Sequence, residues 1–416
     1  MKKTISFYGA IFISILLMFV SYQLFLEKKS AHIEVSKKAG KERSSKKSLT
    51  SQKVTAEQLQ KGYNLPIKES EKKEAEEDCK RAMALIWDIY KKADKGDTSN
   101  VVLSDENINK MQNKLKGTSC PVASMVTYSN MEHYEKMDLF LKECKNGKSG
   151  TIVVYEICSD GGIERMKFNF DGSDLYVLSA NALWNKENKP KITCISYTKI
   201  KAWKYTEKGW FGYELCVPEP PEVSEIVDGS LLIRVKPITR ENREYSKKIV
   251  QKIGYQGNNL LCSNWDEEHL EKLNYNGLYE YLYQLKYKES LDEIDNPDGV
   301  PKDAFETLIT EYLPVTSKRL QKYASFDKKK QTYANEQSGY FNYMPSVLGT
   351  SVPEVVDIKE NKDGTVTLTV DAVCDMVVCE DALITHELTV QFGKDGSFKY
   401  LGNKIVGGDV ENIPNY

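Results

Sequence analysis

The sequence predicts an α+β protein that is tethered to a membrane by one N-terminal helix. Three observations lead to this class. An uncharged apolar run comes first, a basic polar segment follows it, and helical periodicity then gives way to strand alternation twice along the chain. With 416 residues, 40% of them apolar and 28% charged, the chain is long enough for a large core in more than one domain.

The first element is the apolar run from Ile5 to Leu26, which contains no charged residue. At about 1.5 Å per residue, a helix of this length covers roughly 33 Å and spans a hydrocarbon core of about 30 Å. A cleaved secretory signal is the alternative, but its apolar core is shorter and ends at a site of small residues. The stretch after Val20 offers no such site. Residues 1–27 are therefore predicted to be an uncleaved transmembrane anchor.

Residues 28–70 follow as a polar segment without sustained periodicity, which predicts a disordered stalk. Residues 28–53 carry a net charge of +7, whereas residues 54–416 carry −10. The positive-inside rule alone would keep the body in the cytosol, but long domains translocate regardless of flanking charge, and we expect an extracytoplasmic body at the cell membrane. The acidic body argues against nucleic acid as a partner, whereas the basic stalk can contact anionic lipid or an anionic wall polymer.

Residues 71–217 are predicted to form the first domain, with three helices before an aromatic antiparallel sheet. Apolar residues recur at helical spacing from about residue 71, Ser104 is a candidate N-cap, and a third helix is expected over 130–145. Alternating strands then follow, separated by turns such as Asp160-Gly161-Gly162. The many Trp and Tyr residues of these strands could stack a ligand, but filling and covering a sheet is their commoner use.

A proline-rich stretch, residues 218–228, predicts a linker to a second α+β domain over residues 229–416. On one predicted helix of this domain four tyrosines recur at i, i+4 spacing: Tyr275, Tyr279, Tyr283 and Tyr287. Packing against another element is the commoner use of such a stripe, and docking of a partner or a glycan is the alternative. Residues 300–416 are expected to form a helix-plus-sheet unit with three strands.

Two stretches of these strands, PEVVDIKENKDGTVTLTVDAV (Pro353–Val373) and THELTVQFGKDGSFKYLGNKI (Thr385–Ile405), resemble the C-terminal region of an uncharacterised bacterial family. The resemblance covers about the last quarter of the chain and extends loosely over the rest. It implies a single-pass anchor and a large extracytoplasmic body, and no catalytic residues, because the family is a domain of unknown function. The order of helices before a curved sheet also resembles cone-shaped NTF2-like or cystatin-like domains, a likeness that does not indicate function.

Nine cysteines are distributed along the body, and this odd number leaves at least one without a partner in the chain if the others form disulfides. Cys374 and Cys379 flank a short predicted loop, and His386 follows them. A disulfide that closes this loop, free thiols, and a metal site completed by His386 are the three alternatives, of which the disulfide is the simplest. No fourth ligand lies nearby, so we predict neither a metal nor a cofactor.

Catalytic motifs are incomplete throughout the chain. Asn146-Gly147-Lys148-Ser149 ends like a phosphate loop but lacks the first glycine, and His386-Glu387 lacks the second histidine of a zinc protease. We therefore expect a non-enzymatic binding or scaffold protein whose partner is a protein or an anionic surface polymer. The alternative is a hydrolase or isomerase in which His386 acts as general base in a cavity of the C-terminal domain. That alternative fails if both ring nitrogens are bonded inside the core.

Overall fold

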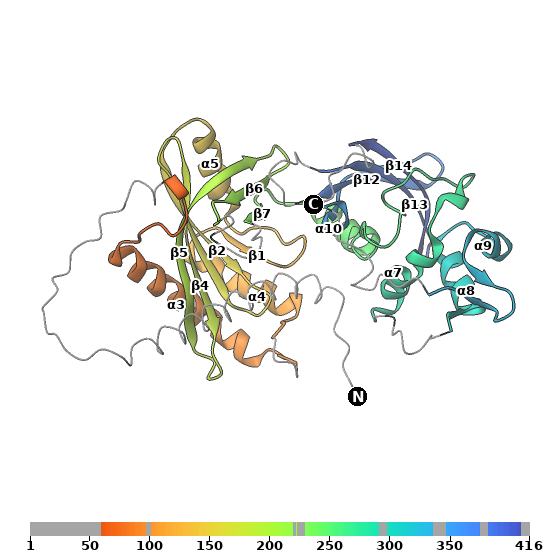
Figure 1. Cartoon of the computed structure of the whole chain (residues 1–416), viewed down its shortest axis with the longest axis horizontal. Helices are drawn as coiled ribbons and strands as arrows, with labels where there is room; N and C mark the ends of the chain where they lie inside the picture. Colours follow the sequence, from red (N-terminus) through yellow and green to blue (C-terminus); the bar gives the residue numbers. More distant parts are fainter. Residues whose placement is uncertain are drawn as a thin grey trace, which may run out of the picture. The chain divides into compact units, whose positions relative to one another are not determined.

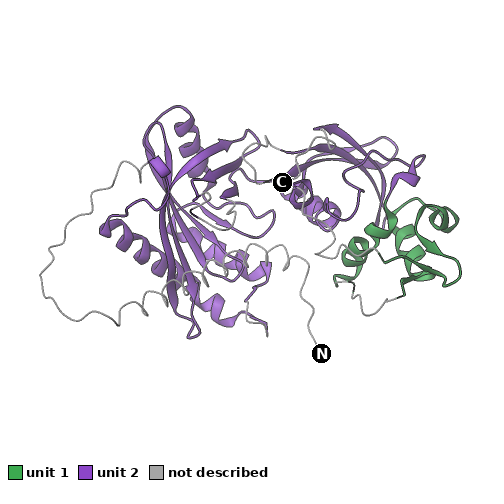
Figure 2. Ribbon diagram, in the orientation of Figure 1, with its two compact units in different colours: residues 1–53, 274–337 green, residues 54–273, 338–416 purple. Residues whose placement is uncertain are grey.

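The computed structural model describes residues 60–96, 101–218, 222, 229–289, 291, 298–335, 347–374 and 382–408. These residues form helices and mostly antiparallel sheets, so the α+β class is confirmed. The chain divides into two compact units (Figure 2): unit 1 comprises residues 1–53 and 274–337, and unit 2 comprises residues 54–273 and 338–416. Within the described ranges no helix is both long and apolar enough to cross a bilayer; the predicted anchor, residues 5–26, lies outside them.

Unit 2 begins with a seven-stranded sheet whose strands lie in chain order, β1 to β7 (Figure 1). Only the first pair of neighbours, β1 and β2, runs parallel. The first part of β5 pairs with β4 and its last part with β6, with a register shift in each pairing, which lets the sheet bend along this long strand. The bounds are β1 Val122–Ser124, β2 Gly150–Ile157, β3 Ile163–Phe170, β4 Leu175–Trp184, β5 Pro190–Tyr205, β6 Trp210–Leu215 and β7 Ser230–Arg234.

Both faces of this sheet carry helices. α3 (Glu69–Lys92) and α4 (Asp105–Leu115) bury their apolar residues on one face, and α5 (Tyr134–Lys145) packs on the other; Lys116–Thr118 form a short 3-10 turn after α4. Ser104 caps α4 as predicted, because its hydroxyl accepts the N–H of Asn107 at 3.3 Å. The third helix begins at Tyr134 instead of residue 130, since His133 has a left-handed backbone (φ 52°) that a right-handed helix cannot include.

Two predicted boundaries differ from those of the fold. The stalk was expected to extend to residue 70, but Leu65 is buried and its N–H donates to the carbonyl of Tyr197 on β5 at 3.0 Å. Gly62 has a left-handed backbone (φ 75°), and a Cβ there would lie 2.8 Å from Cys216 Sγ, so this close approach requires glycine. The predicted linker over 218–228 does not end the first sheet, because β7 follows it and pairs with β6.

The rest of unit 2 contains a four-stranded antiparallel sheet in the order β11-β12-β13-β14. Three strands were expected, whereas the sheet contains four. Its edge strand β11 carries Pro353 and several charged residues. The likeness to cone-shaped domains stays a prediction. The bounds are α6 Arg240–Tyr245, a π-turn at Ser246–Val250, a 3-10 turn at Leu270–Lys272, α10 Val347–Thr350, β11 Val352–Glu360, β12 Thr365–Val373, β13 Thr385–Phe392 and β14 Phe398–Gly407.

Unit 1 is inserted into the chain of unit 2, between residues 273 and 338 (Figure 2). In its described part three helices pack with a small sheet of order β8-β10-β9. Pro314 separates two of these helices, α8 before it and α9 after it, since proline cannot continue a helix. The bounds are α7 Tyr275–Tyr287, β8 Val300–Pro301, α8 Lys302–Tyr312, α9 Ser317–Tyr323, β9 Phe326–Asp327 and β10 Thr332–Tyr333.

Candidate binding site

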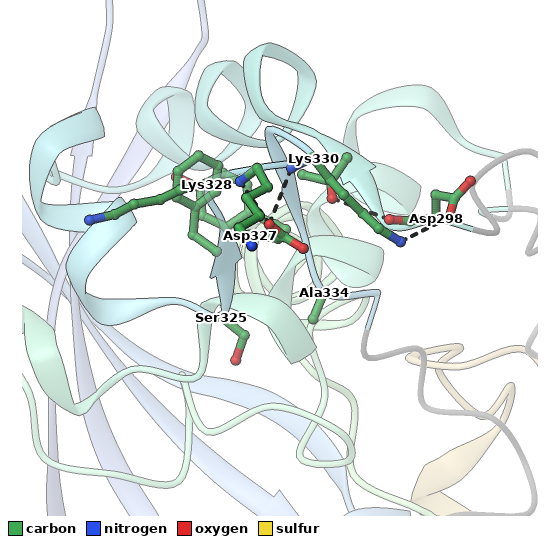
Figure 3. Close-up of a pocket in the computed structure, with 10 residues that line it drawn as sticks. Asp298, Ser325, Asp327, Lys328, Lys330 and Ala334 are labelled. Atoms are coloured by element: carbon green, nitrogen blue, oxygen red, sulfur yellow. Dashed lines mark hydrogen bonds and ion pairs between the residues drawn. The ribbon is translucent and has the colours of Figure 1, made fainter.

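An open groove of about 610 Å³ lies in unit 1 (Figure 3). Its lining comes from the hairpin β9–β10, from the residues beside this hairpin and from Asp298, which precedes β8. Three consecutive lysines, Lys328, Lys329 and Lys330, occupy the turn of the hairpin, and we call them the lysine turn. All three are exposed. The groove is therefore a solvent-facing surface with a high local density of ammonium groups.

The geometry of the lysine turn is set by one carboxylate. Asp327 Oδ1 accepts the backbone N–H groups of Lys329 and Lys330 at 2.8 and 3.1 Å, and these hydrogen bonds lower the pKa of Asp327. Lys330 Nζ is held by Asp298 Oδ1 at 3.1 Å (Figure 3). Within the described residues, the ammonium groups of Lys328 and Lys329 have neither a carboxylate nor a hydrogen-bond acceptor. Two cations thus remain available to a ligand.

Stacked aromatic rings pack against the hairpin β9–β10. The ring centroids of Phe305 and Tyr333 lie 4.0 Å apart, Tyr333 also packs against the half-buried Phe326 at 4.7 Å, and Phe305 stacks on Tyr279 of α7 at 5.0 Å. The hydroxyl of Tyr333 donates to Glu306 Oε1 at 2.8 Å. The first two tyrosines of the predicted stripe on α7 are buried, whereas Tyr287 is 48% exposed. Most of this stripe therefore packs, and it gives the lysine turn a rigid base.

His386, the residue of the enzymatic alternative, lies on β13 and is fully buried. Its Nδ1 lies 2.6 Å from Asn403 Oδ1 on β14, and its Nε2 lies 3.0 Å from the Tyr255 hydroxyl. Both ring nitrogens are thus bonded inside the core, and burial lowers the pKa of His386 to about 4. The ring has no free nitrogen with which to take a proton from a substrate. His386 is a structural residue, and no observation favours a cavity site around it.

The other predicted site residues are only partly described. Cys374 directly follows β12 and is buried, but Cys379 lies outside the described residues, so their predicted disulfide stays a prediction. Across the described ranges, no group of three or more His, Cys, Asp or Glu residues is placed to hold a metal ion. Seven further cysteines are thiols, and burial raises the pKa of Cys79 to about 12 and those of Cys144 and Cys262 to about 11. Such thiols stay protonated and unreactive.

The sequence reasoning missed an acid pair, Glu156 on β2 and Glu164 on β3. The two residues are directly opposite each other in the register, so both side chains lie on the face of the sheet that α5 also contacts. Glu164 accepts a hydrogen bond from the Ser179 hydroxyl. Burial, followed by the charge of Glu164, raises the pKa of Glu156 to about 8, and burial raises the pKa of Glu164 as well. Near neutral pH Glu156 is therefore largely protonated beside the carboxyl group of Glu164.

This acid pair makes the stability of unit 2 dependent on pH. Because the pKa of Glu156 is higher in the folded state, its favourable contribution is present below the unfolded pKa of about 4.5 and is lost as pH rises towards about 8. Glu156→Gln removes this loss and is expected to raise the free energy of unfolding by about 1–3 kcal/mol at pH 8, a range reduced for solvent access to half-buried side chains.

Urea unfolding at a series of pH values measures this effect. The difference between Glu156→Gln and the original chain should be small near about pH 4.5 and grow steadily towards about pH 8. Glu214→Gln is a suitable control, since this carboxylate lies on β6 of the same sheet and pairs with Lys201 at 2.9 Å. A difference for Glu156→Gln that does not change with pH would contradict the raised pKa of Glu156.

No curated protein and no solved structure matches this chain. A family of unknown function matches residues 72–416, a range that begins in α3 and includes the acid pair, His386 and the groove of unit 1. The predicted membership of an uncharacterised family is thereby confirmed. The chain belongs to this family of unknown function, DUF6070.

Proposed function

We propose that the protein is a membrane-tethered, non-catalytic binding protein, and that the groove of unit 1 binds an anionic polymer outside the cell. Residues 5–26 serve as the transmembrane anchor and the basic stalk follows them. One observation carries the proposal: Lys328 and Lys329 present two ammonium groups, unpaired among the described residues, at an open groove whose hairpin is held by stacked rings. An open groove suits a segment of a long polymer better than a small molecule, which needs enclosure.

The acidic charge of the body does not oppose such binding. Residues 54–416 carry −10, but at physiological ionic strength charges are screened beyond about 8 Å. A phosphate in the groove therefore interacts mainly with the lysine turn, in which Lys330 is already neutralised by Asp298. The stalk adds a second cationic segment, with +7 over residues 28–53. Two separate basic sites on one chain favour a long polyanion through multivalent attachment.

An extracytoplasmic body is compatible with the cysteine chemistry of the described residues. Seven cysteines are thiols in the fold, which by itself suits a reducing compartment. Desolvation raises the pKa of each of these thiols, and only the thiolate form is readily oxidised. Thiols protected in this way can persist outside the cytoplasm. This supports the placement on which the proposed polymer ligand depends.

The double substitution Lys328→Gln and Lys329→Gln is expected to weaken polyanion binding by about 5–20-fold at low salt, because fewer counterions are released when fewer ammonium groups meet phosphate. The measurement uses the full-length chain in nanodiscs of neutral lipid, with fluorescein-labelled inorganic polyphosphate as probe and anisotropy as readout. The slope of log K against log salt should fall by about 0.7–0.9 for each lysine–phosphate pair that the substitution removes.

Lys362→Gln with Lys394→Gln is the matched control, since both lysines are exposed in hairpin turns of unit 2 and the net charge changes equally. This control should leave the affinity and the salt slope nearly unchanged. Neutralising the basic residues of the stalk separates the two attachment sites. If the lysine turn variant binds polyphosphate as the original chain does, while the stalk variant loses binding, the groove is not the site.

A further inference from the structure

The chain passes only once between the two sheets of unit 2 in the described residues, through positions 235–239 between β7 and α6. Everything else that joins the sheets there is non-covalent. Asn130, in the loop after β1, uses its side chain to bond both the N–H and the carbonyl of Ile238, at 3.0 and 3.1 Å. The single crossing is thereby fixed to the first sheet at Ile238.

Two ion pairs with buried carboxylates lie at this joint. Arg234 Nη1 on β7 lies 2.8 Å from Glu354 Oε1 on β11, and Lys208, in the turn between β5 and β6, pairs with Asp371 on β12. Glu354 and Asp371 are direct neighbours in the register of β11 and β12, and their side chains are only 3% and 1% exposed. The first sheet supplies both cations, and the second sheet supplies both anions.

Other contacts complete the joint. Arg234 stacks over the ring of Trp210 at 4.8 Å, and the Tyr128 hydroxyl donates to the carbonyl of Pro353, next to Glu354. Tyr128 has a left-handed backbone (φ 62°), an uncommon conformation for a bulky residue, which its surroundings must stabilise. Asp371 Oδ1 also accepts the hydroxyl of Thr385 at 2.7 Å. The two ion pairs and the Tyr128–Pro353 hydrogen bond thus join the sheets, whereas the Trp210 and Thr385 contacts hold Arg234 and Asp371 in place within their own sheets.

We propose that this joint is a latch between the two sheets of unit 2, which closes more tightly when Glu354 takes up a proton. The charged groups that face Glu354 are Arg234 on β7, Lys208 in the β5–β6 turn and Asp371 on β12. Protonation removes the repulsion between two adjacent buried carboxylates, and the neutral acid still accepts a hydrogen bond from Arg234. In an open joint water solvates the carboxylate, so opening favours the charged form.

The sign of the pH response follows from linkage. Burial raises the pKa of Glu354 to about 7 although Arg234 opposes this, whereas an exposed glutamate titrates near 4.5. The closed joint therefore binds the proton more tightly, and the ratio of open to closed forms rises with pH between these values and is constant above about 7. The difference between a pKa near 4.5 in the open joint and one of about 7 in the closed joint changes the ratio of open to closed forms by up to about 300-fold, since each pKa unit is a factor of ten.

Fluorine NMR of the full-length chain in detergent micelles, labelled with 5-fluorotryptophan, tests the protonation. The chain contains five Trp residues, and Trp210→Phe assigns the resonance that reports the joint. We expect this resonance to titrate with a midpoint near 7, and to be independent of pH in Glu354→Gln, which mimics the neutral acid in size and shape. Glu244→Gln, at an exposed pair with Arg240, should leave the titration unchanged.

Hydroxyl-radical footprinting of Tyr128 tests the closure itself, because this side chain is 7% exposed in the closed joint. In the original chain the oxidation rate of Tyr128 should be at least about threefold higher at pH 8 than at pH 6. In Glu354→Gln the rate should be equally low at both pH values. A Trp210 resonance that does not titrate, or that titrates equally in Glu354→Gln, overturns the proposal. A Tyr128 rate that is independent of pH while Trp210 titrates overturns it too, since Glu354 would then take up a proton without moving the joint.

Discussion

Replacing Arg165 by methionine is expected to lower the free energy of unfolding of unit 2 by about 3–5 kcal/mol. The guanidinium is fully buried on β3, where Nε donates to Asp78 Oδ2 at 2.8 Å and Nη2 lies 3.1 Å from Glu74 Oε1. Both carboxylates belong to α3, so these contacts join the helix to the sheet. Methionine fills much of the space but removes the buried cation. Asp78, whose side chain is 16% exposed, then keeps only the exposed Arg81 as an ion-pair partner.

Lys167→Met is the matched control for this substitution. Lys167 lies on the same face of β3, with its ammonium 3.5 Å from Glu74 and 3.8 Å from Glu71, but it is 23% exposed. Removing a solvated pair of this kind should change stability by less than about 1 kcal/mol. Urea unfolding, followed by circular dichroism, measures the free energy of unfolding of both variants. The two values can be compared directly if the m-values of the variants are equal. A loss below about 1 kcal/mol for Arg165→Met would show that the buried pair does not hold α3 to the sheet.

One atom of this arrangement is unsatisfied: Arg165 Nη1 is buried and has no hydrogen-bond partner among the described residues. An incomplete buried ion pair contributes little net stability, although removing one partner alone is costly. The combined change of Arg165→Met and Asp78→Leu should therefore recover at least half of the stability that the single change loses. The coupling energy from the double-mutant cycle measures the pair itself.

The sequence could not place Arg165, although it predicted the strand that carries it. Met166, Phe168 and Phe170 alternate along β3 and indicate one buried face, which assigns Arg165 to the solvent side by its period of two. In the fold α3 covers that side as well, so both faces are buried. The partners of Arg165 are far away in sequence, and local periodicity carries no information about which helix returns to cover a strand.

The acid pair was accessible from the sequence in part. A hairpin about the predicted turn, which is centred on Gly161, pairs Glu156 with Met166 and so places Glu156 and Glu164 on the same face. The observed register is centred on Asp160 and brings the two glutamates directly opposite each other. What the turn does not reveal is how much of that face is covered, and this coverage decides how far the pKa values of two such carboxyl groups are raised. The insertion of unit 1 into unit 2 could not be predicted for a similar reason. Local periodicity indicates the helices of unit 1, but tertiary packing decides that the chain rejoins unit 2 after them.

Acid is expected to destabilise unit 2 through His386, by about 3 kcal/mol between pH 6.5 and pH 4. The buried ring has its pKa lowered from 6.5 to about 4, because no neighbouring charge compensates for desolvation of the imidazolium. Above about pH 6.5 the ring is neutral in both states and its full contribution is present. As pH falls from there towards 4, the unfolded chain binds a proton that the folded core refuses, and stability declines by about 1.4 kcal/mol per unit.

Other carboxylates titrate over the same range, so the test compares slopes between variants. His386→Gln keeps groups that can bond Tyr255 and Asn403 but cannot take up a proton, and its unfolding free energy should fall less steeply with acid than that of the original chain. His269→Gln, at an exposed histidine, should keep the original slope, because water solvates an imidazolium there in both states. Equal slopes for His386→Gln and the original chain would mean that the core admits the charged ring. A shallower slope confined to His386→Gln would identify the Tyr255–His386–Asn403 contacts as a structural network that excludes a proton, which is the opposite of what a general base requires.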